Sequence, residues 1–202
     1  AELDCRKRQY EYYRNKLLSY EGNEVEWKML GEVGTFIRGN GLQKKDLITS
    51  GIPAIHYGQI YTYYGVSAEQ TISFVSPETA KGLRKVDYGD VIITNTSENI
   101  DDVGKAVAYC VKEQGVTGGH ATIFKPSEKI IGKYLVYYTQ TTEFSNQKRK
   151  YAKGTKVIDV SANDLAKITI PLPPLEEQQR IASILDKFDT LVNSISEGLP
   201  KE

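Results

Sequence analysis

The chain has 202 residues, of which 40% are apolar and 26% are charged, and its 26 basic residues balance 26 acidic ones. This composition is typical of a soluble globular protein with its own core, and the net charge of zero argues against a nonspecific nucleic-acid binder. No run approaches about 20 apolar residues and the first residues lack the apolar core of a secretory signal, so we expect a cytoplasmic protein that does not cross a membrane.

The first predicted element is a helix over residues 2–20, a segment without glycine or proline. Leu3, Tyr10 and Leu17 recur every seven residues, and Tyr13 follows Tyr10 by three. This spacing places the four side chains on one helix face, as in a coiled coil. The apolar face must be buried, either against another helix or against the chain's own globular domain.

The middle of the chain predicts short strands and turns. Six segments are rich in β-branched and aromatic residues and are bounded by Gly, Asn, Asp or Pro. They are residues 33–37, 52–57, 71–75, 90–94, 103–111 and 121–125. Residues 131–150 predict a helix instead. The pattern indicates an α+β fold: a globular domain with a mainly antiparallel sheet, flanked by N-terminal and C-terminal helices of coiled-coil type.

A second long helix is predicted after Pro173 and Pro174. Proline suits the start of a helix, and the acidic Glu176 and Glu177 in the first turn favour its dipole. Residues 174–197 would span about 36 Å, close to one turn of DNA. Apolar residues three and four apart form one seam along this segment. They are Ile181, Ile184, Leu185, Phe188, Leu191, Val192 and Ile195.

The two helical ends also fit each other in register. If Ala1 followed Glu202 directly, Leu3 would lie fourteen residues, or two heptads, beyond Leu191. Tyr10 and Leu17 would continue the same row. This agreement suggests that the terminal helices are two parts of one longer seam.

Catalytic signatures are missing from the sequence. Methyl transfer to a base needs a cofactor-binding loop and a polar-Pro-Pro-aromatic motif, and residues 90–99 are polar after a strand but lack the Pro-Pro pair. The glycine-rich residues 34–41 lack the spacing of a phosphate-binding loop. Asp101 and Asp102 are adjacent, which suits a loop surface better than the carboxylate cluster of a magnesium-dependent nuclease. We therefore expect no catalytic residue.

Metal and disulfide sites are not expected either. Cys5 and Cys110 lie far apart and outside any C-x-x-C spacing, so they predict reduced thiols. His56 and His120 add too few ligands for a zinc site.

The strongest candidate for DNA contact is a run of five basic residues without an acid. The residues are Lys148, Arg149, Lys150, Lys153 and Lys156. Cations beside Gly154 and Thr155 suit phosphate contacts, since a glycine backbone can approach a phosphate closely. The alternative is a solvated helix end, where cations favour the helix dipole.

A polar run follows the predicted strand over residues 90–94. Asn95, Thr96 and Ser97 carry short donors and acceptors that can read base edges, although such residues also form turns. Lys105, beside Gly104, is placed to reach a phosphate.

The chain is also unusually rich in tyrosine, with 14 Tyr against 5 Phe and 1 Trp. Tyrosine suits interfaces and half-wet surfaces. Tyr57, Gln59 and Tyr61 combine aromatic rings, hydroxyls and an amide, which suit phosphate and adenine contacts, but packing against a sheet fits equally well. His120 follows two glycines in a predicted loop or bulge and is a further candidate to enter a DNA groove.

The segment ITIPLPPLEEQQRIASILDKFDTLV, residues 168–192, closely resembles the conserved region of type I restriction-modification DNA specificity subunits. In that family a short strand runs through a proline-rich turn into a long helix. Weaker motifs agree in the same order and extend the resemblance over nearly the whole chain. They are Trp27 with Leu30, Gly51-Ile52-Pro53, Gly89-Asp90-Val91-Ile92-Ile93, Val103-Gly104-Lys105-Ala106 and Gly154-Thr155.

The resemblance implies a non-catalytic subunit. Full-length members look like two target-recognition domains that alternate with two conserved helices, and each domain reads half of a bipartite target. This chain looks like one repeat cut within a helix, in a half-sized or single target-recognition-domain form. Residues 1–20 would be the distal part of the spacer helix, 21–172 the target-recognition domain, and 173–202 the proximal part of the helix. No base-reading position carries over by motif, because members read different targets.

The resemblance also implies partners. The chain would bind double-stranded DNA and dock methyltransferase subunits that carry S-adenosylmethionine and flip an adenine. A restriction subunit with ATP and Mg would translocate and cut, and the chain itself would bind no cofactor. A homodimer through the helices would rebuild the two-domain arrangement and read a palindromic target. Two alternatives remain, a coiled-coil scaffold that never touches DNA and a recognition domain of a fused restriction-methylation enzyme.

Overall fold

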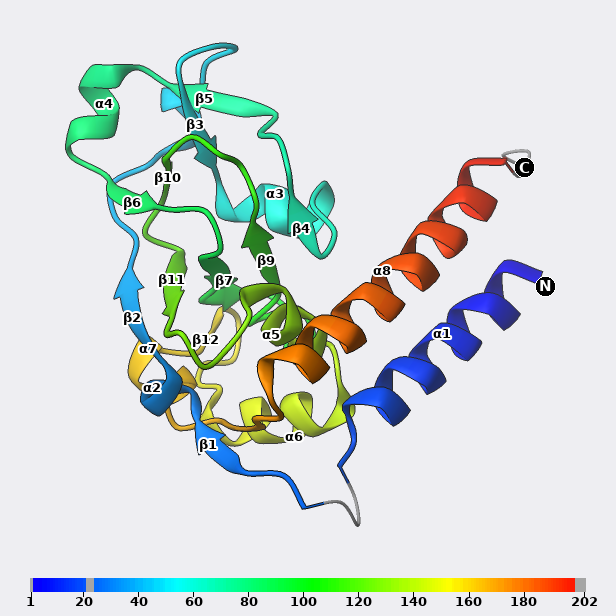
Figure 1. Ribbon diagram of the computed structural model, residues 1–202. Helices are drawn as coiled ribbons and strands as arrows, with labels where there is room; N and C mark the ends of the chain where they lie inside the picture. Colours follow the sequence, from blue (N-terminus) through cyan, green and yellow to red (C-terminus); the bar gives the residue numbers. More distant parts are fainter. Residues whose placement is uncertain (1, 21–23, 199–202) are drawn as a thin grey trace.

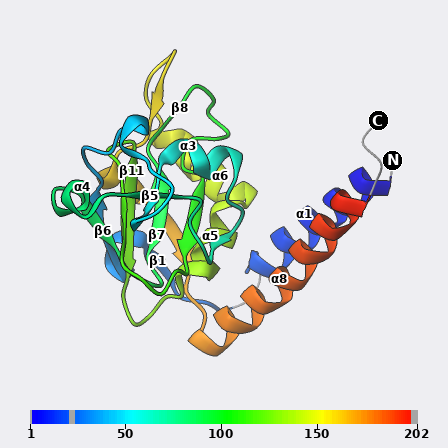
Figure 2. The same cartoon turned by 90° about the horizontal axis from the view of Figure 1, so that it is seen from above.

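The computed structural model describes residues 2–20 and 24–198, with side chains described within residues 4–20 and 24–191. A body of strands and short helices carries two long helices, α1 (Glu2–Leu18) and α8 (Leu175–Gly198), that project side by side from one flank (Figure 1). Their far ends lie together, because α1 runs toward the body and α8 runs away from it (Figures 1 and 2). Both predicted terminal helices are confirmed.

The centre of the body is a five-stranded sheet in the order β2-β11-β7-β9-β4. Only the β4–β9 pair in this sheet is parallel. Neighbouring residues of β7 alternate between two apolar cores, Val91 and Ile93 on one face and Ile92 on the other, as the period of a strand requires. The strands are β2 (Gly34–Arg38), β4 (Ser67–Ala68), β7 (Val91–Thr94), β9 (Ala106–Tyr109) and β11 (Ala121–Pro126).

Smaller sheets complete the body. A four-stranded sheet in the order β5-β3-β10-β6 covers the Ile92 side, with Ile55 and Val86 in the shared core. Two antiparallel pairs, β1–β13 and β8–β12, stand apart from these sheets. The bounds are β1 (Trp27–Met29), β3 (Ile52–Ile55), β5 (Ser73–Val75), β6 (Arg84–Val86), β8 (Thr96–Ser97), β10 (Gly115–Thr117), β12 (Ile158–Asp159) and β13 (Thr169–Pro171).

The expected α+β fold with a mainly antiparallel sheet is confirmed, and each of the six predicted strand segments contains a strand. The segment at 33–37 starts one residue later than predicted, because Val33 ends a helical turn, α2 (Leu30–Val33). The remaining short helices are η1 (Lys44–Asp46), α3 (Tyr57–Thr62), α4 (Pro77–Lys81) and α7 (Ala162–Leu165).

The single helix predicted over residues 131–150 is wrong. The structure has two helices there, α5 (Gly132–Thr139) and α6 (Thr142–Tyr151). The break falls at Thr141, whose hydroxyl accepts a hydrogen bond from the backbone N–H of Phe144 and so caps the start of α6. This cap separates the two helices, and the basic residues 148–150 lie in the last turn of α6.

Part of the tyrosine excess belongs to the core. Tyr134, Tyr137 and Tyr138 of α5 are fully buried against the five-stranded sheet. The Tyr134 hydroxyl donates to the backbone oxygen of Pro171 at 3.0 Å, and burial raises its pKa. The expectation that tyrosine marks interfaces therefore fails for these α5 residues. The Tyr134 and Tyr137 hydroxyls have hydrogen-bond partners, whereas the Tyr138 hydroxyl is buried without one.

The base of α8 is locked to the body by a buried amide. Gln178 is fully buried, accepts a hydrogen bond from the N–H of Ile131, and donates to the oxygens of Lys129 and Pro173. Further along, the Asp186 carboxylate accepts from the Tyr137 hydroxyl at 2.6 Å and pairs with Lys133 at 3.0 Å. The direction in which the long helix leaves the body is thus set by specific contacts.

Candidate nucleic-acid interface

Several of the residues that the sequence nominates meet around α3. His56 caps this helix, since its Nδ1 accepts from the N–H of Gly58 at 3.2 Å. The next residue, Tyr57, lies between two imidazoles, with its ring centre 4.6 Å from His56 and 4.8 Å from His120. His120 is exposed in a turn before β11, so residues more than sixty positions apart form one aromatic cluster.

Hydrogen bonds tie this cluster to the polar run after β7. The Tyr61 hydroxyl donates to the backbone oxygen of Thr96 at 2.8 Å, and the Thr96 hydroxyl lies 3.0 Å from Nδ1 of His120. Lys105 is exposed and donates to the backbone oxygen of Tyr61. Burial raises the pKa of Tyr61, which keeps its hydroxyl a donor. Tyr57 and Tyr61 lie on the short helix α3, Thr96 on β8, His120 in a turn and Lys105 in a loop. Tyr57 also packs against the apolar core on the Ile92 side of the sheet, as the packing alternative expects.

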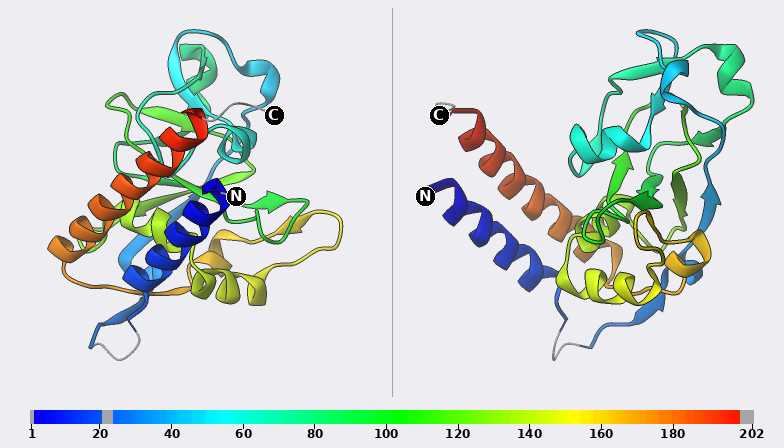
Figure 3. Two further views of the ribbon diagram at one scale, coloured as in Figure 1. Left: turned by 90° about the vertical axis from the view of Figure 1, so that its right-hand side faces the viewer. Right: turned by 180° about the vertical axis from the view of Figure 1, so that it is seen from behind.

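A basic finger, residues 153–159, stands beside the cluster. Its β12 strand pairs with β8, and the finger projects well beyond the rest of the body (Figures 2 and 3). Lys153 and Lys156 are exposed on it. The sequence predicted DNA contacts for both, and the structure places them on the same side of the molecule as Thr96 and Ser97.

The sequence analysis did not predict two basic residues that lie near the aromatic cluster. Arg38, at the end of β2, donates from Nε to the backbone oxygen of Gly119, next to His120. Lys44 of η1 lies close enough to His56 to contribute, after burial and His120, to the lowered pKa of that imidazole. Arg38 ends a strand and Lys44 begins a short helical turn, and neither belongs to a long run of basic residues, so only tertiary structure brings them to the site.

Three predicted residues face inward instead. Asn95 is fully buried: its amide donates to the oxygen of Val160 at 2.8 Å and accepts from the Thr122 hydroxyl. Gln59 uses its amide to complete the cap at His56 and to bond Ser73. These contacts give Asn95 and Gln59 structural roles, and we do not place either at the interface. The third residue is Lys148.

Lys148, the first residue of the predicted basic run, is buried, so the prediction that it contacts a phosphate is wrong. Lys148 is only 4% exposed, and its ammonium donates to the backbone oxygen of Asp101. Burial lowers its pKa to about 8, against the opposing effect of Asp101. Arg149 is exposed and pairs with the Asp101 carboxylate, while Lys150 is exposed at the end of α6. Lys148 therefore serves the fold, and Lys150 stays a candidate for phosphate contact.

The predicted helix seam divides into two parts. At the base of α8, Ile181 and Leu185 are buried in the main core, with Tyr10 and Leu17 of α1 packed against that core. Farther out Tyr13 stacks on Phe188, with ring centres 5.6 Å apart. Ile184 is half-buried and Leu191 is exposed, and the side chains of Leu3, Val192 and Ile195 lie outside the described residues. The described residues of α1 therefore pack against α8 of the same chain.

Within residues 4–20 and 24–191, no group of three or more His, Cys, Asp or Glu side chains is arranged to hold a metal ion. Cys5 and Cys110 are free thiols. None of the helices described is long and apolar enough to cross a bilayer.

Comparison with known proteins places this geometry in a family. The model of the type I restriction modification DNA specificity domain matches residues 23–202. The chain belongs to this family. The finding agrees with the resemblance carried by the proline-rich start of α8.

Curated relatives of this specificity domain cover its whole length. The type I restriction enzyme EcoR124I/EcoR124II specificity subunit of Escherichia coli is 35% identical over 208 residues, which is 100% of this chain and 50% of the relative. A putative type I restriction enzyme specificity subunit of Haemophilus influenzae is 31% identical and covers 98% of this chain and 49% of the relative. The chain therefore spans about half the length of the curated relatives it matches.

Solved structures agree on the fold. The HsdS subunit from Thermoanaerobacter tengcongensis matches with a TM-score of 0.69 over 98% of this chain and 47% of that one, at 19% identity. A chain from a study of complex assembly and conformational transition of the type I R-M system matches with a TM-score of 0.72 over 97% and 47%, at 20% identity. At such identities the likeness speaks for the fold alone.

Proposed function

We propose that this specificity domain reads one half of a bipartite DNA target. The face that reads it is formed by α3, β8 and the basic finger. The observation that carries the proposal is the convergence of Tyr57, Thr96, His120 and Lys105 from four separate segments onto one face. Arg38 adds a cation to it. Cations of this kind position a protein on phosphates, while hydroxyl and imidazole groups can reach base edges.

The domain does this without chemistry of its own. Methylation belongs to partner subunits that bind S-adenosylmethionine and flip the adenine, and restriction belongs to a further subunit that uses ATP and Mg. The sequence lacks catalytic motifs for either reaction, and the family membership supports the assignment to such a complex. The complex would act in the cytoplasm, where it meets double-stranded DNA.

The decisive experiment combines the chain with its cognate methyltransferase and maps methylated adenines on genomic DNA. Exchange of residues 21–172 for those of an unrelated family member should move methylation to new sites. Methylation at unchanged sites would refute DNA reading and favour the scaffold alternative. No methylation with a separate methyltransferase subunit, but site-selective methylation when the domain is joined to a methyltransferase in one chain, would favour the fused-enzyme alternative.

The phosphate contacts have a separate test with a matched control. Lys153→Gln with Lys156→Gln should weaken binding to all sequences alike and reduce the slope of log K against log salt by about 0.9 for each phosphate that is no longer neutralised. The control is Lys112→Gln. Lys112 is exposed beyond the opposite end of β9 from Lys105, so its charge should not matter. Equal effects of both changes would contradict the proposed face.

We also propose that two copies associate through the ends of their long helices that lie farthest from the body. In each copy the start of α1 and the end of α8 lie at the same far end, so a two-fold axis there would let α8 of one copy run on into α1 of the other (Figure 3). The heptad register across the termini supports this arrangement. A molar mass of two chains at micromolar concentration is expected, and a mass of one chain would contradict it.

A further inference from the structure

The tip of the basic finger is built to a defined shape. Lys153 and Asp159 form an isolated antiparallel bridge, with N–H to oxygen distances of 2.9 and 2.8 Å, and close a short turn between them. Gly154 has φ +106°, and a Cβ at this position would lie 2.0 Å from the backbone oxygen of Val157. Only glycine fits there, so the turn is held in one conformation.

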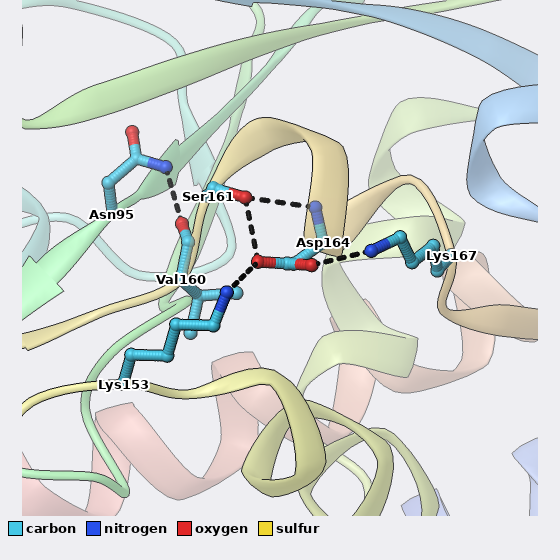
Figure 4. Close-up of polar contacts among 6 residues, drawn as sticks. All are labelled: Asn95, Lys153, Val160, Ser161, Asp164 and Lys167. Carbon is cyan, nitrogen blue, oxygen red and sulfur yellow. Dashed lines mark hydrogen bonds and ion pairs between the residues drawn. The ribbon is translucent and has the colours of Figure 1, made fainter.

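The two feet of the finger are clamped to the body (Figure 4). On one side, the buried Asn95 donates to the oxygen of Val160 at 2.8 Å. On the other, Lys153 lies 3.5 Å from the Asp164 carboxylate, which also accepts from Lys167 and from the Ser161 hydroxyl. Because both ends of the finger are held by these contacts, the finger loses little conformational entropy when it binds.

One exposed residue in the turn of the finger is apolar. Val157 is 59% exposed between Lys156 and the half-buried Ile158, in the segment that projects beyond the rest of the body (Figure 2). Its branched side chain has few rotamers, so the methyl groups are held in place. Phosphate oxygens offer nothing to such a side chain, whereas the flanking lysines suit phosphates.

A two-stranded ribbon fits the major groove of DNA, and the apolar group that base edges present there is the 5-methyl of thymine. We propose that the basic finger enters the major groove and that Val157 contacts the 5-methyl group of one thymine in the half-site. This inference rests on the proposed function and adds to it a base and the residue that selects it. Lys156, next to Val157, would contact a phosphate at the edge of the groove.

The test uses the chain with its cognate methyltransferase on the target found by methylation mapping. Each thymine of the half-site is replaced in turn by uracil, which removes the 5-methyl group alone. For the native chain, affinity should fall about fourfold at one thymine, the factor expected for one buried methyl-sized group. In Val157→Ser, which has no methyl group, the same uracil should cause no further loss. Val157→Ile should keep the sensitivity.

Lys156→Gln serves as the matched control and should weaken thymine and uracil targets alike. The inference is overturned by a half-site without thymine beyond the partner of the methylated adenine, by insensitivity to every uracil, or by full uracil sensitivity in Val157→Ser. A fall in affinity of Val157→Ser that is equal for all sequences would also overturn it, leaving the finger as a phosphate contact. Failure of the proposed function is a different result, because the native chain would then direct no site-selective methylation.

Discussion

Lys148→Met should stabilise the domain and leave DNA binding unchanged. The sequence nominates Lys148 as a phosphate contact, whereas the structure buries it at 4% exposure with its ammonium on the backbone oxygen of Asp101. Methionine fills a similar volume without the charge. Asp101 is exposed, so its carbonyl can bond water when the lysine is gone.

The magnitude follows from the cost of keeping this buried ammonium charged. Its pKa falls from 10.5 to about 8, with burial as the main cause. At 1.36 kcal/mol per pKa unit the charged form costs about 3 kcal/mol of folding free energy at pH 7, where lysine is protonated in both states. Because the folded pKa is the lower one, this cost is full below pH 8 and fades as the pH rises toward 10.5.

Urea unfolding of the native chain and of Lys148→Met at pH 7 and pH 10 measures this effect. The gain in unfolding free energy should be about 3 kcal/mol at pH 7 and about 1 kcal/mol at pH 10. Lys150→Met is the control, since Lys150 is exposed two residues along α6 and should show no such dependence. A gain that does not change with pH, or a loss of DNA affinity as large as that of Lys156→Gln, would refute the reasoning.

Three further predictions concern the supports of the site. Gln178→Ala should destabilise the chain by about 1–3 kcal/mol in urea unfolding, because three backbone groups would lose the partner that the buried amide provides; Gln178→Glu, which can accept but not donate, should cost nearly as much. Lys167 and Ser161 lower the pKa of Asp164 to about 2, so its stabilisation is present above pH 4 and is lost as the pH falls toward 2; acid titration of Asp164→Asn should lack this loss. Gly154→Ala should weaken DNA binding without lowering the melting temperature of the body, and unchanged binding would show that the finger turn is not needed.

The parts of the fold that the sequence predicts are those set by local pattern. Strands such as β7 and β11 consist of buried β-branched and apolar residues between turn formers, and their apolar runs are visible without tertiary contacts. The split between α5 and α6 was missed because Thr141 resembles its neighbours in composition, and only its capping bond marks the break. The two-residue strands β8 and β12 exist only through their pairing with each other.

The site shows the same division. Residue type and position after a strand point to Thr96 and His120, but the neighbouring Asn95 turns inward, and its burial depends on contacts with Thr122 and Val160. For Lys148 a signal was present. It lies four residues after Phe144, which is buried on the same face of α6, so helical spacing could have separated it from the exposed Lys150.

Asn95 offers the sharpest test of how specificity is divided between contact and support. If it read a base, Asn95→Ala would relax the preference at one target position, that of an adenine, and leave stability unchanged. As a buried clamp, it instead leaves the oxygen of Val160 and the hydroxyl of Thr122 without a partner, which should cost about 1–3 kcal/mol for each group. The finger would then lose one of the two contacts that anchor it to the body. Discrimination should therefore decrease at every target position near its tip, not at one position alone. Asn95→Asp should behave like Asn95→Ala toward Val160, because a carboxylate has no hydrogen to donate to that oxygen. Relaxed preference at a single position with native stability would return Asn95 to the interface.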